Sequence, residues 1–260
     1  MHFDRKSIGK IRDFWFETER NTKEENGADF AQYHDLSVCP ADKKWLVAIQ
    51  PRKTLINDLN DDADKIIAKF KKNTKYEIKR AAKEGCYSQF IIGSDVCKHE
   101  DILKRIDDAH AQMFTDKGKQ SKSEYPVMLA AAKSNMLAIS IGFLSDGREC
   151  AYHVYIVGNG CARLLHSISI FREVETNDDR NAIGRLNRFL HYDDMINLKK
   201  SGYQTYDWGG YSEEEQLKSI SEFKAAFGGD IIDVYTAVYA TSILGKLTSG
   251  IVKKIKFKGN

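Results

Sequence analysis

The stretch Tyr206-Asp207-Trp208-Gly209-Gly210 places a carboxylate between aromatic side chains, directly before two glycines. A carboxylate at a strand end can accept a proton from an attacking amine or hydroxyl, directly or through water. Glycines have no Cβ and let a substrate approach the backbone closely. We therefore predict Asp207 as a general base or orienting group and Tyr206 as a donor of a proton to a leaving group. The alternative interpretation is a turn aspartate in a structural corner.

A second candidate base is His153, which shares one face with Tyr155 and Val157 and alternates with Tyr152, Val154 and Ile156. Such alternation is typical of a strand, and His153 would act as a base or acceptor ligand if that face lines a cleft. His166 stands similarly on the next segment. For both, the alternative is a histidine hydrogen-bonded in the core. Neither lies near a Ser or Cys motif typical of a covalent nucleophile, so we expect direct attack on the donor.

Substrate-binding groups are expected on a basic segment between residues 65 and 83 and around the two glycines. Lysines and arginines there would donate charge-assisted hydrogen bonds to phosphates, although a solvated helix face explains the same pattern. The aromatic side chains of Tyr206, Trp208 and Tyr211 would line a pocket or pack in the core. Lys224, shortly before the second glycine pair, would reach a phosphate or complement a helix dipole. The predicted residues are Lys72, Lys75, Arg80, Trp208, Tyr211 and Lys224.

Composition excludes several classes of protein. The chain has 260 residues and a net charge of +3, so no strong overall field favours nucleic acid and no DNA partner is expected. Five scattered cysteines without a CxxC pair are typical of reduced thiols and argue against a metal site. The sequence has no signal-like segment and no apolar run of membrane-spanning length. We expect a cytoplasmic protein, at the inner face of the membrane if it is peripheral.

Hydrophobic periodicity predicts the elements that position these residues. Ile8, Ile11, Phe14 and Trp15 recur at helical spacing, so residues 1–45 are predicted as a helical extension packed on one domain, residues 46–242. Residues 243–260 form an amphipathic basic tail, docked on the core or in contact with anionic lipid. Helices are predicted near 61–85, 101–114, 125–134, 184–201 and 219–227, and strands near 46–49, 53–56, 86–92, 137–144, 150–157, 161–170, 204–208 and 233–239. This pattern predicts a single α/β domain around a mixed, largely antiparallel sheet.

Three ordered segments resemble one family, the FemAB-like transferases. They are Lys72 to Ala81 with Lys83-Glu84-Gly85, then Tyr206 to Gly210, then Phe223 to Gly229. These segments are similar to the family's K-N-T-R-Y-x-I-R-R-A…K-E-G, Y-D-x-G-G and F-K-x-x-F-G-G patterns and span roughly residues 45 to 240. The resemblance implies a GNAT-like fold and transfer of an acyl group to an amine or hydroxyl.

The resemblance also implies alternative donors. Some members take aminoacyl groups from tRNA and build peptidoglycan cross-bridges, whereas others resemble N-acyltransferases of polysaccharide pathways that use acyl-CoA. This chain has room for one such domain and no heptad-repeat arm, unlike the tRNA-using members. We therefore expect acyl-CoA as donor and a nucleotide- or lipid-linked amino sugar as acceptor. Aminoacyl-tRNA is the second hypothesis and a non-catalytic GNAT-like binding protein is the third.

A donor site is expected at a helix start. GNAT enzymes cradle the CoA pyrophosphate on backbone N–H groups there, with the pattern Q/R-x-x-G-x-G/A. The matching place here runs from Arg180 to Arg185, although its spacing differs from that pattern. The alternative is an ordinary helix N-terminus with surface arginines. The predicted cofactor-binding residues are Arg172, Arg180, Gly184 and Arg185.

Overall fold

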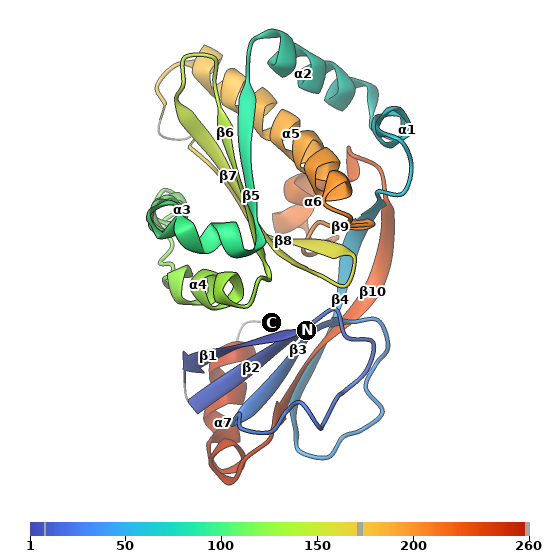
Figure 1. Ribbon diagram of the computed structural model, residues 1–260, viewed down its shortest axis with the longest axis vertical. Coiled ribbons are helices and arrows are strands. Elements are labelled where there is room, and N and C mark those ends of the chain that lie inside the picture. Colours follow the sequence, from blue (N-terminus) through green and yellow to red (C-terminus); the bar gives the residue numbers. More distant parts are fainter. Residues whose placement is uncertain (8, 171–173, 258–260) are drawn as a thin grey trace. The chain divides into compact units, whose positions relative to one another are not determined.

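The computed structural model describes residues 1–7, 9–170 and 174–257, with side chains up to residue 254 (Figure 1). The protein has the predicted mixed, largely antiparallel sheet flanked by helices. The β2/β3 and β8/β9 pairs are parallel, whereas β1/β2, β3/β10, β4/β9, β5/β6, β6/β7 and β7/β8 are antiparallel. The chain divides into two compact units, Met1–Thr54 with Ile231–Asn260, and Leu55–Asp230. The domain boundaries predicted at 45/46 and 242/243 stay predictions.

The first unit contains strands in the order β1-β2-β3-β10-β4. Its elements are β1 (His2–Ser7), β2 (Gly9–Trp15), β3 (Phe30–Leu36), the start of β4 (Leu46–Asp58), β10 (Asp230–Ala240) and α7 (Ile243–Phe257). One face of this sheet buries Phe14 against Tyr33, whose rings stack at 4.5 Å. The other buries Phe30 and Val238 against Val252 of α7.

The predicted helix in residues 1–45 is wrong, because the described elements there are strands. Ile11 and Phe14 are three residues apart, as on one helix face, yet they enter different core clusters. Gly9 adopts φ +87° at the turn between β1 and β2, a conformation that glycine adopts without steric cost. Between the two apolar residues, Asp13 is buried but paired with Arg5 and His34, which lets a carboxylate occupy the strand interior.

The second unit contains strands in the order β4-β9-β8-β7-β6-β5. The strands predicted near 137–144, 150–157 and 161–170 form an antiparallel meander of β6 (Leu137–Phe143), β7 (Glu149–Gly158) and β8 (Cys161–Ser169), with β5 (Tyr87–Ile92) and β9 (Thr205–Asp207) on either side. The two short strands predicted around Pro51 are instead one strand, β4. Because paired residues share a face, the meander presents two continuous surfaces to the helices.

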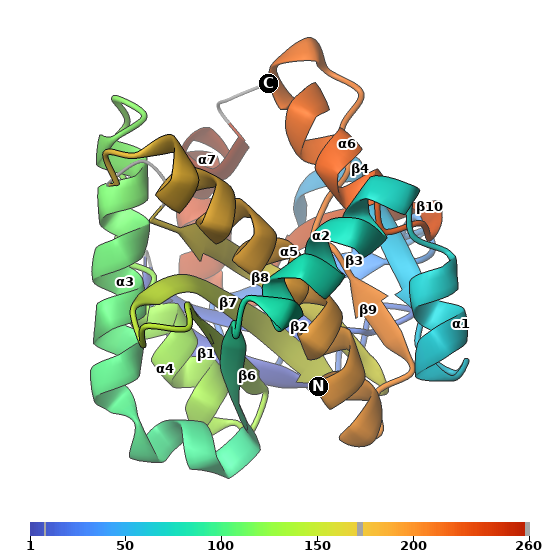
Figure 2. The same cartoon turned by 90° about the horizontal axis from the view of Figure 1, so that it is seen from above.

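Helices cover both faces of this second unit. One face packs against α5 (Asn177–Lys200), which in turn packs against α2 (Lys72–Lys83) (Figure 2). The other face packs against α3 (Glu100–Thr115) and α4 (Tyr125–Lys133). The remaining helices are α1 (Ala63–Ala68), α6 (Lys218–Ala225) and the short 3-10 turns η1 (Gly93–Lys98) and η2 (Glu215–Leu217). The helix predicted near 61–85 is divided into α1 and α2.

Among the described residues, no helix is both long and apolar enough to cross a membrane.

Candidate active site

The parallel strands β8 and β9 pair over only three positions. Their register joins Cys161 to Thr205, Ala162 to Tyr206 and Arg163 to Asp207. β9 then ends, whereas β8 runs on to Ser169. The connection between them is α5, so the two strands form a β-α-β unit whose strands part at their carboxyl ends. In open α/β sheets, ligands bind beyond the carboxyl ends of such strands.

The loop after β9 is held tightly by both family-like motifs. Oδ1 of Asp207 accepts the N–H of Gly209 at 2.7 Å, and Nζ of Lys224 donates to the carbonyls of Trp208 at 2.9 Å and Gly210 at 2.6 Å. Gly209 has φ +72°, and a Cβ there would lie 2.1 Å from the carbonyl oxygen of Leu164. The Y-D-W-G-G and F-K-A-A-F-G-G segments therefore fold as one unit, in which Lys224 closes the glycine loop.

The aromatic residues of the first motif belong to the core. Trp208 is buried, and its indole N–H donates to Asn57 Oδ1 at 2.7 Å. Asn57 in turn donates to the carbonyl of Phe227 at 3.0 Å, and the rings of Trp208 and Phe227 lie 4.8 Å apart. Tyr211 is half-buried at the edge of this cluster. The packing interpretation of Trp208 accounts for all of these contacts.

A buried polar network occupies the α5 face of the sheet. The hydroxyl of Tyr155 donates to Asp194 Oδ2 at 2.6 Å and lies 3.0 Å from the hydroxyl of Tyr206, which is 2.7 Å from His191 Nδ1. His153 adds its Nδ1 at 2.7 Å from the same Asp194 oxygen. One assignment satisfies the tyrosine contacts: Tyr206 donates to Tyr155 and accepts from His191.

Burial sets the protonation of this network. It raises the pKa of Tyr155 and of Tyr206 well above the usual value, so both phenols remain donors. It lowers the pKa of His191 well below the usual value, so this imidazole is neutral. His153 and Asp194 are as deeply buried as the tyrosines. The network thus fixes α5 on the sheet and is closed to solvent.

Two of the three predicted catalytic residues therefore meet, and the third does not. His153 and Tyr206 share the network, whereas Asp207 follows Tyr206 in the strand and points to the opposite face. Asp207 is only 6% exposed. The sequence interpretation missed His191 and Asp194, although their spacing on a helix, three residues apart, places both on one face.

The face shared with Asp207 carries a second histidine group. The sheet register places Arg163, Asp207 and His166 on the side of α3 and α4. The His166 ring lies 4.6 Å from that of His110 in α3, and its Nε2 is 3.9 Å from Glu124 Oε2. This Nε2 is buried and has no hydrogen-bond partner among the described residues.

Electrostatics keep this imidazole neutral. Burial lowers the pKa of His166 to about 4, and the nearby charges of His110 and Arg163 act in the same direction, against Asp107. Burial also lowers the pKa of His110. The His166 side chain is nevertheless partly exposed. A neutral imidazole just beyond the point where β8 and β9 part is able to accept a proton or a hydrogen bond.

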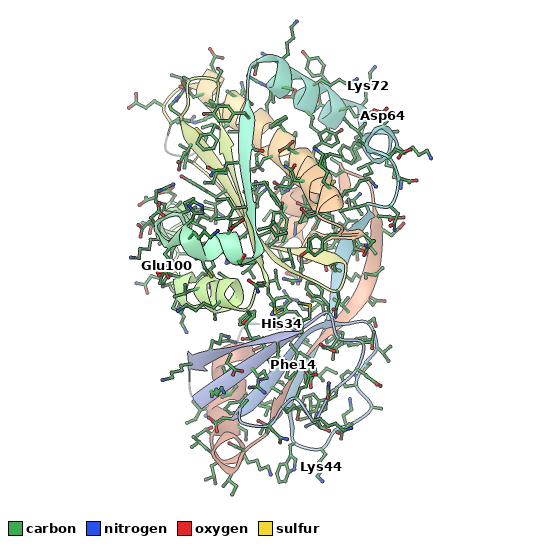
Figure 3. All side chains as sticks on the ribbon, in the orientation of Figure 1. Phe14, His34, Lys44, Asp64, Lys72 and Glu100 are labelled. Atoms are coloured by element: carbon green, nitrogen blue, oxygen red, sulfur yellow. The ribbon has the colours of Figure 1, made fainter. Side chains whose placement is uncertain are left out.

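The predicted phosphate-binding residues lie on α2. Lys72 is exposed at the start of that helix (Figure 3). Lys75 is half-buried and donates to the carbonyl of Ala68 at 3.3 Å. Arg80 donates to Glu84 at 2.8 Å. Of these three, Lys72 is the side chain most available to a ligand.

The predicted cofactor-binding segment is not a helix start. α5 begins at Asn177, and the side chain of its N-cap residue, Thr176, accepts the N–H of Asp179. The prediction of a helix start at Gly184 is therefore wrong. The backbone N–H of Arg180 already donates to Thr176 inside the helix. Gly184 therefore lies within the helix, and backbone N–H groups there are used by helical hydrogen bonds.

The arginines of that segment have local partners. Arg180 donates to the carbonyl of Val174 at 3.2 Å. Arg185 donates to Glu84 Oε2 at 2.8 Å, so Arg185 and Arg80 share one carboxylate. Although burial opposes ionisation, hydrogen bonds from these two arginines hold the pKa of Glu84 below its usual value. This ion cluster joins α2 to α5. Arg172 lies outside the described residues.

No group of His, Cys, Asp and Glu side chains in the described part of the chain is arranged to hold a metal ion.

The fold that carries this site is of the FemAB-like, GNAT type. The structure of FemX aligns with a TM-score of 0.63 and 12% identity, over 96% of this chain and 86% of that one. The C-terminal domain of a proposed lysylphosphatidylglycerol synthetase from Agrobacterium fabrum aligns with a TM-score of 0.54 and 15% identity, over 97% and 84%. L-PGS from Bacillus licheniformis aligns with a TM-score of 0.51 and 11% identity, over 97% and 84%.

No known family's sequence profile matches the chain, and no curated protein sequence matches it. At these identities the similarity establishes the fold and leaves the reaction to the residues of this chain.

Proposed function

We propose that this protein is an acyltransferase that moves an acyl or aminoacyl group onto an amine or hydroxyl of a cell-envelope precursor. The observation that carries the proposal is the parting of the parallel strands β8 and β9 just beyond Arg163 and Asp207, within a fold shared with FemX. This arrangement offers a place for a donor at the carboxyl ends of the strands. Direct attack by the acceptor requires a proton acceptor and no covalent enzyme intermediate.

His166 is our first candidate for that proton acceptor. It is neutral near pH 7 because its pKa is lowered to about 4, and its Nε2 is without a hydrogen-bond partner in the described part of the chain. Asp207 shares its face and fixes the loop that follows β9. His153 and Tyr206 support the site from the opposite face as parts of the closed network.

The start of α5 favours an aminoacyl ester over acyl-CoA as the donor. The first turn contains Asp178 and Asp179, and Asp179 is paired with Arg148 at 2.9 Å. A CoA pyrophosphate placed at this helix start would meet negative charge, which opposes the attraction of the helix dipole. One structure with the same fold is named for the synthesis of lysylphosphatidylglycerol, a lipid that carries an aminoacyl group. We therefore propose aminoacyl-tRNA as donor, with acyl-CoA as the second candidate.

The direct test offers the protein labelled aminoacyl-tRNAs or labelled acyl-CoAs, with nucleotide-linked amino sugars or phosphatidylglycerol vesicles as acceptors. Transfer of label from tRNA supports the proposal, and transfer from CoA alone restores the sequence-based expectation. Binding of donor without transfer to any acceptor identifies a non-catalytic binding protein and contradicts the proposal.

A variant pair assigns the base. We expect His166→Gln to lower kcat by about 100-fold or more with little change in KM, because the loss of a general base affects the transition state more than binding. The matched variant His110→Gln removes the neighbouring ring and should retain most of the activity. Circular dichroism and thermal melting establish that both variants are folded. Equal losses in the two variants would show that the histidine pair acts through structure alone.

A further inference from the structure

The C-terminal helix α7 has two apolar sides. One side packs on the first unit's sheet through Val252, beside Ile11 and Phe30. On the same side, a Cβ at Gly245 would lie 2.0 Å from the carbonyl oxygen of Asp29, so the helix packs directly against the backbone at Asp29. The side turned away carries four large apolar residues that are 52–80% exposed: Ile243, Leu244, Leu247 and Ile251.

These four residues form a stripe, because positions 243, 247 and 251 repeat every four residues along the helix. Folding of the unit leaves the stripe in water. Contiguous exposed apolar surface of this kind marks a site of contact with another molecule or with a membrane.

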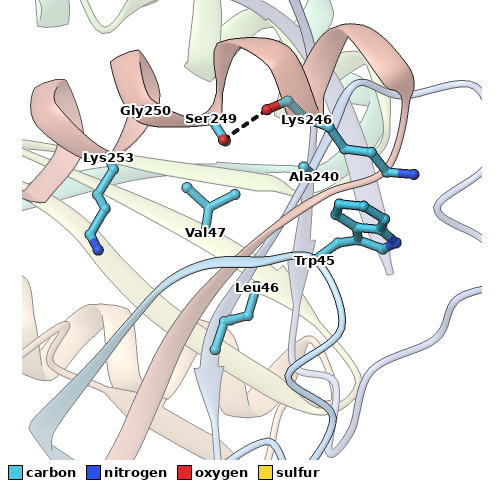
Figure 4. Close-up of a pocket in the computed structure, with 8 residues that line it drawn as sticks. All are labelled: Trp45, Leu46, Val47, Ala240, Lys246, Ser249, Gly250 and Lys253. Carbon is cyan, nitrogen blue, oxygen red and sulfur yellow. Dashed lines mark hydrogen bonds between the residues drawn. The ribbon is translucent and has the colours of Figure 1, made fainter.

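A hollow of about 190 Å³ lies beside the stripe, between α7 and the start of β4 (Figure 4). Its apolar lining includes Leu46, Val47 and Ala240. Figure 4 shows Lys253 at one end and Lys246 at the other, with Trp45 next to Lys246. Nζ of Lys246 lies 3.9 Å from the centre of the Trp45 ring, which is 51% exposed. The hollow is therefore lined by apolar side chains, with a lysine at each end and a partly exposed tryptophan beside one of them.

The charge of the C-terminal segment has one sign. Residues 243–260 include five lysines and no aspartate or glutamate. Lys253 and Lys254 are exposed on α7. A second copy of the chain laid face to face on this surface would bring lysines against lysines, which opposes association. An anionic phospholipid bilayer offers phosphates to the lysines and acyl chains to the stripe, and tryptophan favours the boundary between the two.

We propose that α7, with Trp45, docks in the plane of an anionic phospholipid bilayer. The helix has 15 residues, fewer than a membrane span requires, and its apolar stripe with flanking lysines suits an interfacial helix. Ile243, Leu247 and Ile251 enter the boundary of the acyl chains, while Lys253 and Lys254 contact lipid phosphates. This proposal is independent of the reaction catalysed at the second unit.

Tryptophan fluorescence reports this contact at one residue. The chain has three tryptophans, and Trp15 and Trp208 are buried, so an added quencher in lipid reaches Trp45 first. With vesicles of phosphatidylglycerol and phosphatidylcholine at low salt, we expect a blue shift of the emission and quenching by brominated acyl chains. Vesicles of phosphatidylcholine alone should give little of either. The Trp45→Phe variant should lose the fluorescence response and still sediment with the anionic vesicles.

Variants separate the apolar and charged contributions. Leu247→Ser with Ile251→Ser should weaken sedimentation with anionic vesicles by about tenfold or more, and Lys253→Gln with Lys254→Gln should weaken it similarly and reduce its salt dependence. Matched controls lie in the second unit: Ile220→Ser removes an exposed apolar residue of α6, and Lys104→Gln with Lys133→Gln removes two exposed charges. These controls should bind like the wild type, and all of these variants should melt like it because the changed residues are exposed.

Three results would overturn the proposal. The first is no sedimentation with anionic vesicles at low salt. The second is binding that is unchanged in the Leu247→Ser, Ile251→Ser variant or that leaves Trp45 unquenched, which would place the contact elsewhere. The third is a dimer, seen by light scattering, that this variant dissociates, which would make a second copy the occupant of the stripe.

Discussion

Burial separates three histidines of the second unit, His153, His191 and His166, into two kinds. His153 and His191 are sealed within the network on the α5 face, where their ring nitrogens contact Asp194 and Tyr206. His166 is partly exposed on the other face, and burial lowers its pKa to about 4. The same residue type thus stabilises the core in one place and offers a proton acceptor in the other.

The lowered pKa of His166 predicts how stability depends on pH. The folded-state pKa of about 4 lies below the ordinary value of about 6.5, so the unfolded chain binds the proton first. The stabilising contribution of neutral His166 is therefore complete above about pH 6.5 and is lost as the pH falls towards 4. Between pH 7.5 and pH 5, the wild type should lose about 2 kcal/mol more unfolding free energy than His166→Gln.

Urea unfolding at the two pH values measures this difference. His110 shifts in the same direction and remains in both proteins, while Asp107, Arg163 and Glu124 supply the surrounding charges in both. Parallel pH profiles for the wild type and His166→Gln would contradict the lowered pKa.

At the scale of elements, the glycine loop after β9 depends on α6. Lys224 of α6 closes the loop with two hydrogen bonds, and Gly209 lies against the β8 backbone. The two motifs that resemble the FemAB-like transferases thus meet in space although their sequences are separate. Their common role is to hold the chain where β8 and β9 part.

Two glycines with similar backbone angles test the close approach. Gly209 (φ +72°) has the Leu164 carbonyl oxygen 2.1 Å from an added Cβ, whereas Gly202 (φ +91°) has nothing within 4 Å. Gly202→Ala should cost about 1–2 kcal/mol of unfolding free energy, from the backbone conformation alone. Gly209→Ala should cost about 2 kcal/mol more, because the backbone must also shift. Similar costs in urea unfolding would show that the loop relaxes freely around the added methyl group.

At the scale of the whole molecule, each of the two compact units contains buried core clusters of its own. Phe14 and Tyr33 pack in the first unit, and Leu186 and Leu190 pack in the second. Local unfolding follows such cooperative groups of contacts. Each core should therefore respond to its own large-to-small substitutions.

Hydrogen exchange read by mass spectrometry tests this independence. Phe14→Ala should remove about 3–5 kcal/mol of protection from β1, β2 and β3 and leave most of it in β6 and β7. Leu190→Ala should have the opposite pattern. Equal loss of protection in both units from either variant would show that the chain unfolds as a single cooperative unit.

Local pattern was sufficient for most elements after residue 45. Helices α3 and α4 and the meander β6-β7-β8 lie close to their predicted bounds, because their periodicity and turn residues agree. The prediction failed in residues 1–45, where Ile11 and Phe14 mimic a helical repeat but lie on opposite faces of a strand. A short apolar pattern does not distinguish these cases, since sheet pairing with distant β10 decides between them.

The sequence by itself determined the fold type, through three ordered motifs and a regular alternation of apolar residues. The tertiary structure alone decided what the motif residues contact. It committed Lys224 to two carbonyls and joined Arg80 to Arg185 through Glu84. It also brought His191 and Asp194 to Tyr155 and Tyr206, and His110 to His166. The physical reason is that hydrogen bonds and pKa values depend on distances between segments far apart in the chain, which no local pattern contains.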